Sequence, residues 1–180
     1  YEPFMPGVDE VGGQNASATG YCTKKFADIR DRDAGPKHQG TLDYVIIRYA
    51  EILLTYVEAL VEGGDYNNPD VVKYLNQIRH RANMPDVNVS VYNTQEKLRE
   101  LYRRERRVEL ALEGQRLWDI RRWGIGEQVM DGTLYGAYDP NTGQHVVVES
   151  RSYSSPKNDQ WPIHVSEINV NPNLKQNIGW

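Results

Sequence analysis

An amphipathic helix is the sequence feature that most constrains how this 180-residue chain can fold. It is predicted over residues 43–62, with Asp43 as its N-cap and Gly63-Gly64 as its stop signal. Apolar residues recur along it at three- and four-residue steps, which places them on one face. That face is predicted to comprise Tyr49, Ile52, Leu53, Tyr56, Val57 and Leu60. A helix with such a face needs another element to cover it.

A second helix is predicted from Asn68-Pro69 to about Asn83, where Pro85 ends the pattern. Asparagine is a frequent N-cap, and proline suits the first helical position because its N–H would have no helical partner there. The side that faces the first helix is predicted to comprise Val71, Val72, Leu75, Ile78 and Ala82. The two helices are predicted to form an antiparallel hairpin similar to a tetratricopeptide repeat, and a lone repeat must stack on further helices.

A third helix is predicted over about residues 94–113, where Asn93 and Glu96 have capping-box spacing. Its buried stripe is marked by Leu98, Leu101, Val108 and Leu112. Glu105 falls on the same stripe, and a carboxylate in that position is costly unless it is paired. We therefore predict that Glu105 is at least partly buried and forms a structural ion pair with an arginine. The candidate partners are Arg79, Arg81 and Arg121.

Charge patterning argues against a nucleic-acid partner. Nine basic residues lie between Lys97 and Arg122, but Asp119 and five glutamates alternate with them, at positions 96, 100, 105, 109 and 113. Pairs such as Glu100 and Arg104 have the spacing of salt bridges on a solvated helix. The whole chain carries 21 basic and 25 acidic residues, which gives no general attraction to nucleic acid or to anionic lipid.

Outside these helices the chain is rich in turn residues. Residues 1–43 are predicted to be loop, with at most a short strand near 21–26, and a short helix is predicted over 115–124. Residues 131–160 hold Asp-Gly, Asn-Thr-Gly and Ser-Ser-Pro turn signals around one strand-like run, His145–Glu149. The predicted fold is mostly α, with tetratricopeptide-like helix pairs and long irregular loops.

No motif for catalysis, metal binding or cofactor binding stands out. The four histidines lack metal-ligand spacing, the single Cys22 excludes a cysteine-based zinc site, and there is no glycine-rich phosphate loop. Burial of Glu105 would suit a catalytic acid only if a second group converged on it, and glycoside hydrolysis needs two carboxylates at a defined gap. Nothing in the sequence favours such a pair. We predict a protein that is not an enzyme and has neither metal nor cofactor.

Four blocks of sequence resemble one family. They are Ile47-Arg-Tyr-Ala-Glu-Ile-Leu-Leu-Thr-Tyr-Val-Glu-Ala-Leu, Leu75-Asn-Gln-Ile-Arg-His-Arg-Ala, Glu105-Arg-Arg-Val-Glu-Leu with Glu113-Gly-Gln-Arg-Leu-Trp-Asp-Ile-Arg-Arg-Trp, and Trp161-Pro-Ile-His with Asn171-Pro-Asn-Leu-Lys-Gln-Asn. In this order they resemble blocks typical of the SusD/RagB family, and they cover about residues 44–180. The departures are small, such as His164 where proline is common.

The resemblance implies a SusD-like, mostly α fold and a place in the C-terminal part of a longer protein. Residues 1–43 would join a missing N-terminal part, and residues 44–180 would form the C-terminal helical region, with a loop insertion near 131–160. It also implies a lipoprotein at the cell surface, in the outer membrane of Bacteroidetes-type bacteria, held by a lipid anchor on the missing part. Cys22 is not the expected anchor, because no signal peptide precedes it.

The implied partner is a SusC-type TonB-dependent transporter, to which captured nutrients pass without catalysis. Family ligands are oligosaccharides in many members and peptides in some. Aromatic side chains suit the apolar face of a sugar ring, so Tyr135, Tyr138 and Tyr153 are predicted ligand contacts, with packing as the alternative. Trp118 and Trp161 are expected to pack as scaffold. The alternative for the chain is a helical scaffold of the transporter complex, which scattered or buried tyrosines would favour.

Overall fold

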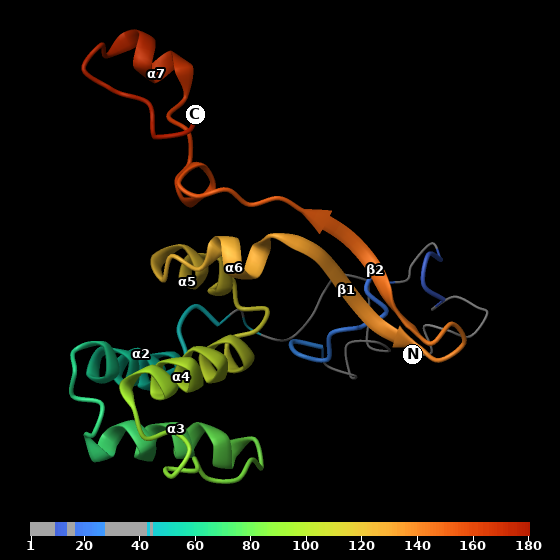
Figure 1. Cartoon of the computed structure of the whole chain (residues 1–180), viewed down its shortest axis with the longest axis vertical. Helices are drawn as coiled ribbons and strands as arrows, with labels where there is room; N and C mark the ends of the chain where they lie inside the picture. The colour runs from blue at the N-terminus through green and yellow to red at the C-terminus, as the bar shows by residue number, and fades with distance from the viewer. Residues whose placement is uncertain (1–9, 14–16, 28–42, 44) are drawn as a thin grey trace. The chain divides into compact units, whose positions relative to one another are not determined.

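The computed structural model describes residues 10–13, 17–27, 43 and 45–180 (Figure 1). Its helices are α2 (Tyr49–Glu62), α3 (Pro69–Arg81), α4 (Gln95–Glu109), α5 (Arg116–Arg122), α6 (Gly126–Met130) and α7 (Val165–Val170), with a 3-10 turn at Lys157–Asp159. Two strands, β1 (Gly132–Asp139) and β2 (Gln144–Arg151), complete the described elements. The prediction of a mostly helical chain is confirmed. None of the described helices is long and apolar enough to cross a membrane.

The chain divides into two units, each of which is described by itself. One unit is Gly40–Leu117, and the other is Trp118–Trp180 together with the segment Tyr1–Gln39. The division expected from the sequence, into residues 1–43 and 44–180, concerns the longer protein and stays a prediction.

In the unit Gly40–Leu117, helices α2, α3 and α4 pack on one another around an apolar core (Figure 1). Each fully buried valine or leucine stabilises the unit by about 1.5–3 kcal/mol. The core side chains are Leu53, Leu54, Val57, Val61, Val71, Leu75, Ile78, Val87, Leu98, Leu101, Tyr102 and Leu110. The predicted hairpin of α2 and α3 is present, and α4 supplies the stacking helix that it needs.

The first helix begins later than predicted. Helix α2 starts at Tyr49 with Arg48 as its N-cap, and Arg48 makes no side-chain capping bond. Asp43 therefore does not cap this helix. The reason lies in the intervening Val45, Ile46 and Ile47, whose branched β-carbons favour extended backbone over helix.

The prediction of the buried face of α2 is right for two of its six residues, and a third, Leu60, is half-buried. Leu53 and Val57 are buried, but Tyr49 and Ile52 are 66% and 53% exposed, and Tyr56 is exposed as well. The buried face is completed by Leu54 and Val61, which were not predicted. The helix is apolar around more than half of its circumference, so periodicity alone does not decide which stripe α3 and α4 cover.

Helix α3 agrees more closely with the sequence. The Asn68 side chain caps it by accepting a hydrogen bond from the Asp70 N–H at 3.0 Å. Val71, Leu75 and Ile78 are buried as predicted, whereas Val72 is half-buried and Ala82 is exposed. Ala82 is exposed because the helix has already ended at Arg81.

Helix α4 is shorter than predicted, and its buried residues differ from the predicted ones towards its C-terminal end. Its cap is Thr94, which accepts from the Lys97 N–H at 3.3 Å, and it ends at Glu109. Val108 and Leu112 were predicted to be buried, but they are 69% and 66% exposed. Leu112 is exposed because the helix has already ended and this residue lies in a left-handed turn at φ +66°. Val108 is still helical, but Arg106 and Glu109 take the buried positions of that turn.

The charged residues of the unit join its helices to one another. Arg48 donates hydrogen bonds to Glu113 at 2.7 and 2.8 Å and to the Glu109 carboxylate at 2.8 Å, and both acidic side chains are 7% exposed. Glu105 is 16% exposed and accepts a hydrogen bond from Arg79, which is the partner among the three candidate arginines. These contacts link the start of α2 and the end of α3 to α4.

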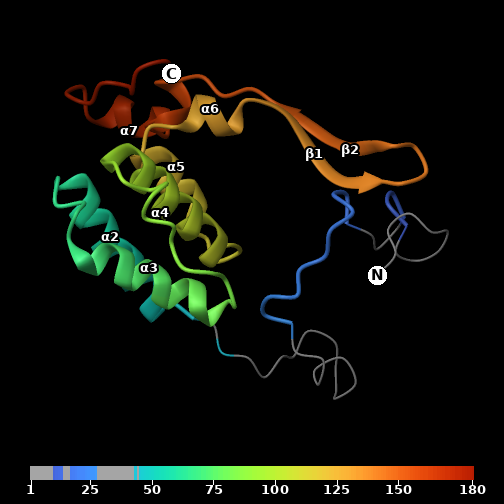
Figure 2. The same ribbon diagram turned by 60° about the horizontal axis from the view of Figure 1, so that its bottom comes forward.

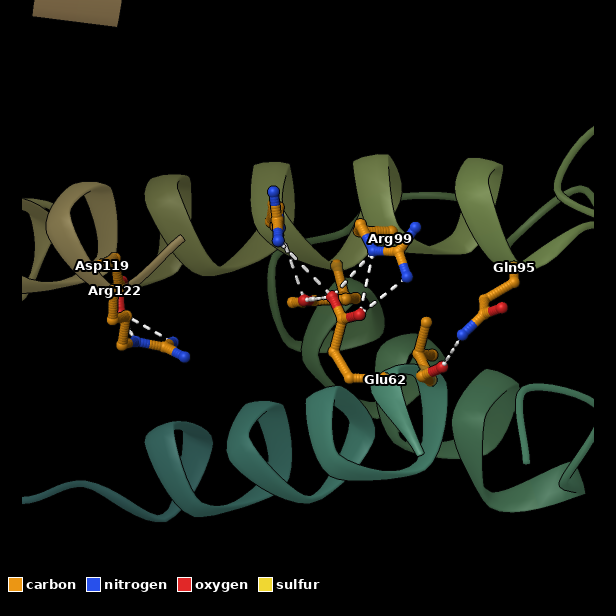
Figure 3. A network of polar contacts seen from close by, with 8 residues as sticks. Glu62, Gln95, Arg99, Asp119 and Arg122 are labelled. Atoms are coloured by element: carbon orange, nitrogen blue, oxygen red, sulfur yellow. Dashed lines mark hydrogen bonds and ion pairs between the residues drawn. The ribbon is translucent and has the colours of Figure 1, made fainter. Parts of the chain in front are cut away.

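A second polar cluster lies between α2 and α4 (Figure 3). Arg99 binds the Glu62 carboxylate with two nitrogens at 2.7–3.0 Å, and the Tyr102 hydroxyl donates to Glu62 at 2.6 Å. The bond from Arg99 lowers the pKa of Glu62 from 4.5 to about 2. Burial and the bond to Glu62 raise the pKa of Tyr102. Glu62 is therefore a fixed anion at neutral pH.

The second unit contains an antiparallel hairpin of β1 and β2 (Figure 2). Strand β2 covers and extends the predicted run at 145–149. Strand β1 was not predicted, because Gly132 and Gly136 interrupt its apolar pattern and read as turn signals. The described residues 21–27 contain no strand, so that segment is loop as expected.

Candidate functional site

The hairpin places two of the three predicted tyrosines on one face. In a regular strand, Tyr135 and Tyr138 would point to opposite sides, because they are three residues apart. Here Tyr135 lies opposite Val147 and Tyr138 lies opposite His145, and the register shifts between them. Since Val147 and His145 are two residues apart on β2, they share a face, and the tyrosines opposite them share it too.

This face is open to solvent. Tyr135 and Tyr138 are 65% and 54% exposed, and Val147 is 64% exposed. The Tyr138 and His145 rings meet edge to face, with centroids 5.5 Å apart. His145 is held by its Nδ1, which donates to the Gly136 carbonyl oxygen at 3.0 Å. The result is an aromatic platform, defined here by Tyr135, Tyr138, His145 and Val147.

A residue of the N-terminal segment, Thr19, stabilises the irregular register between β1 and β2. The Ala137 N–H donates to the Thr19 carbonyl oxygen at 2.7 Å, so Thr19 takes up a bond that β2 does not. Any β-carbon at Gly136 would lie 2.3 Å from that same oxygen, which only glycine avoids. Gly136 and Ala137 are both buried as a result.

The hairpin end is rigid as well. The Asp139 side chain accepts from the Asn141 N–H at 2.8 Å and from the Thr142 hydroxyl at 3.0 Å. Gly143 closes the turn at φ +71° and donates to the Asp139 carbonyl oxygen at 2.9 Å. Asp, Asn and Gly are the residues that such a turn requires. The platform is therefore pre-formed, which lowers the entropic cost of binding a ligand.

Tyr153 has a different environment. Its hydroxyl donates to Asp159 at 2.8 Å, its N–H donates to Asp131 at 3.0 Å, and its ring fills the space beside Gly126. Burial and the bond to Asp159 raise the pKa of Tyr153, and bonds from Ser155 and Tyr153 lower the pKa of Asp159. Tyr153 thus joins α6 to the segment after β2. It is not part of the platform, and its ligand contact stays a prediction.

A second aromatic surface lies in the same unit. An open cleft of about 640 Å³ is lined by Trp118, Arg121, Arg122, Asp159, Gln160, Trp161 and Asn177. Trp118, Arg121 and Arg122 lie at helical spacing on α5, which brings them to one side of that helix. The Arg121 guanidinium stacks on the Trp161 ring, 4.6 Å from its centroid. The volume falls within the range of small-molecule sites.

The C-terminal tail positions Trp161 in this cleft. The Gln176 amide exchanges two 2.8 Å hydrogen bonds with the backbone of Ile163, and Asn177 donates to the Trp161 carbonyl oxygen at 2.6 Å. Trp161 and Trp118 are 65% and 58% exposed, so the described residues leave most of their surface uncovered, and the expectation that they pack as scaffold in the longer protein stays a prediction. The sequence gives no sign of this, since bonds to the backbone fix the position of Trp161 and leave its ring uncovered.

One pair of carboxylates, Glu109 and Glu113, was a candidate for hydrolytic chemistry. Glu109 and Glu113 are close together, but both are bonded to Arg48 and nearly buried. Among the described residues, no three or more His, Cys, Asp or Glu side chains are placed to hold a metal ion. The chemistry available at the platform and the cleft is ring stacking and hydrogen bonding.

Comparisons with known proteins all point to the same family. The SusD family model matches residues 5–180. Two SusD-like proteins of Formosa agariphila are 36% identical over 96 residues and 30% identical over 140 residues. These alignments cover 51% and 74% of the chain, but only 19% and 24% of the relatives. The chain therefore spans about a fifth to a quarter of the length of these relatives.

Solved structures agree. A SusD-like protein from Bacteroides fragilis is 38% identical with a TM-score of 0.66, covering 76% of this chain and 26% of that one. A SusD-like carbohydrate binding protein from the same organism is 41% identical with a TM-score of 0.60, covering 72% of this chain and 28% of that one. About three quarters of the chain thus has a fold already seen in longer proteins.

Proposed function

The chain belongs to the SusD family, and from this premise we propose that it is part of a non-catalytic, cell-surface protein that captures glycans. The observation that carries the proposal is the aromatic platform. Tyr135 and Tyr138 share one exposed, rigidly held face, and exposed aromatic rings suit the apolar face of a sugar ring. The similarity to a carbohydrate binding protein from B. fragilis supports the same ligand class.

The proposal includes a partner and a location. Captured ligand would pass to a SusC-type TonB-dependent transporter in the outer membrane, with the protein held by a lipid anchor outside the present residues. What supports this is the family membership. The absence of catalysis is supported by the carboxylates, since the two nearly buried ones in α4 and the following turn are bonded to Arg48.

Calorimetry of the intact protein against a panel of oligosaccharides and peptides tests the proposal. We expect saturable binding of an oligosaccharide, recovered unchanged when the mixture is analysed afterwards. Recovery of shortened products would overturn the non-catalytic assignment. Saturable binding of peptides alone would place the protein among peptide-binding members, and no binding at all would favour the scaffold role.

Variants of the platform test its part in binding. Tyr135→Ala and Tyr138→Ala are each expected to weaken oligosaccharide binding about threefold to tenfold, because an aromatic contact contributes about 0.5–1.5 kcal/mol. The matched control is Tyr49→Ala, which removes an equally exposed tyrosine from α2. Equal affinity of all three variants and the unmodified protein would show that the platform is not the binding surface.

A further inference from the structure

We propose that the cleft lined by Trp118, Arg121 and Trp161 binds an anionic group, a carboxylate or a sulfate ester, carried by a sugar ring. The proposal rests on the proposed glycan capture and names the class of glycan. It also assigns a second ligand surface, because none of these three residues belongs to the platform on β1 and β2.

The first observation is the bonding state of Arg121. Its Nε is buried and has no hydrogen-bond partner. Its guanidinium stacks on the Trp161 ring, 4.6 Å from the centroid, and donates to the Tyr153 hydroxyl. Within the described part of the chain it forms no direct ion pair, and the Asp159 carboxylate attracts it only from a longer distance. Arginines with buried nitrogens are normally paired with an anion. A bound anion would give this guanidinium the direct ion pair that Asp159 does not form with it.

The second observation concerns the other charges of the cleft. Arg122 is already bonded to the buried Asp119, at 2.8 and 2.9 Å. Asp159 is the carboxylate in the lining, and its two oxygens accept from Tyr153 at 2.8 Å and from Ser155 at 2.5 Å. Of the two arginines in the lining, Arg122 therefore has a direct ion pair, whereas Arg121 has only the longer-range attraction of Asp159.

The third observation concerns the side chains that line the cleft beside Arg121. Two exposed indoles, Trp118 and Trp161, line the same cleft. Indole faces bind the C–H groups of a sugar ring, and a guanidinium binds planar or tetrahedral oxyanions through paired N–H donors. An inorganic anion would use only the arginine. A sugar with a carboxylate or sulfate uses the arginine and the rings together.

The test compares acidic glycans with their neutral forms on the intact protein. The probes are uronate oligosaccharides from pectin and alginate with their methyl esters, and sulfated galactan oligosaccharides with their desulfated forms. We expect at least one acidic probe to bind about tenfold more tightly than its neutral form, with a preference that weakens as salt is added. The uronate and sulfate arms separate the two sources of negative charge.

Variants then locate the preference. Arg121→Gln is expected to abolish the preference for the acidic form, Arg121→Lys to retain part of it, and Trp118→Ala to weaken both forms equally. Arg107→Gln, an exposed arginine of α4, is the control for net charge. Helical circular dichroism confirms that each variant is folded.

The outcomes separate the two proposals. Equal binding of acidic and neutral forms, or a preference that survives Arg121→Gln, overturns the anionic cleft and leaves glycan capture intact. If no probe binds, acidic or neutral, and the wider oligosaccharide panel also fails, then glycan capture itself is refuted.

Discussion

Replacing Arg48 with methionine should loosen the helical unit more than any other single change to its surface charges. The change removes four hydrogen bonds of 2.7–2.9 Å, three to the carboxylates of Glu109 and Glu113 and one to the Glu109 carbonyl oxygen. Both carboxylates are 7% exposed, so they would lose a cation that water replaces poorly. Breaking such a buried pair costs about 3–5 kcal/mol.

Arg81 lowers this expectation toward 3 kcal/mol, because it also donates to Glu109, at 2.6 Å. The assay is amide hydrogen exchange in α2 and α4 of the intact protein, which reports local opening without requiring two-state unfolding of the whole chain. A loss of about 3 kcal/mol speeds exchange by about a hundredfold. The matched control Arg107→Met, on the exposed side of α4, should change the opening free energy by less than about 0.5 kcal/mol.

A second substitution identifies the physical cause. If the loss of the Arg48 counter-charge beside Glu113 dominates, then adding Glu113→Gln to Arg48→Met should restore part of the protection, because a neutral amide costs less to bury. If lost packing dominates, the double variant should exchange at least as fast as the single one. Exchange in Arg48→Met no faster than in the Arg107→Met control would refute the role assigned to the cluster.

Three further predictions follow from local contacts. Arg99 lowers the pKa of Glu62 to about 2, so this contact stabilises the unit fully above pH 4.5 and loses that effect as the pH falls toward 2. Urea unfolding between pH 6 and pH 2 should show this decline in the free energy of unfolding, and Arg99→Met should make the decline smaller. Gly136→Val should disorder the hairpin, because its β-carbon would meet the Thr19 carbonyl oxygen at 2.3 Å, and it should weaken oligosaccharide binding even though both platform tyrosines are intact. Asn68→Ala removes the cap of α3 and should cost about 1 kcal/mol of unfolding free energy in urea.

Local signals predicted the helices better than they predicted what the helices bury. Asn68-Pro69 marks the start of α3 because capping depends on neighbouring residues alone. The buried stripe of α2 depends on where α3 and α4 arrive, and a helix with Tyr49 and Ile52 on one side and Leu54 and Val61 on another offers both choices. Pairing of Glu105 could be expected because a charge on an apolar stripe needs a counter-charge wherever the stripe is covered.

The candidate surfaces depend on contacts between residues far apart in the sequence, which explains why they were harder to predict. Tyr135 and Tyr138 could be named as exposed aromatics from their turn-rich surroundings, but the shared face follows from a register shift that Thr19 stabilises from more than a hundred residues away. The cleft likewise requires Asn177 to fix the backbone of Trp161 while α5 presents Arg121. Neither the shared face of the tyrosines nor the cleft produces a periodic pattern in the sequence.

The two units use their polar residues in different ways, and this difference bears on where a ligand can bind. In the helical unit, the nearly buried Glu109 and Glu113 are bonded to Arg48, so adding a ligand there would require breaking existing bonds. In the unit of the hairpin and the tail, Arg121 has a buried nitrogen without a partner, and the exposed tyrosines and indoles have ring faces open to solvent. Groups that already have partners stabilise a fold, whereas groups that lack them gain most from a ligand. Binding is therefore expected at the hairpin and the tail rather than at the charged helices.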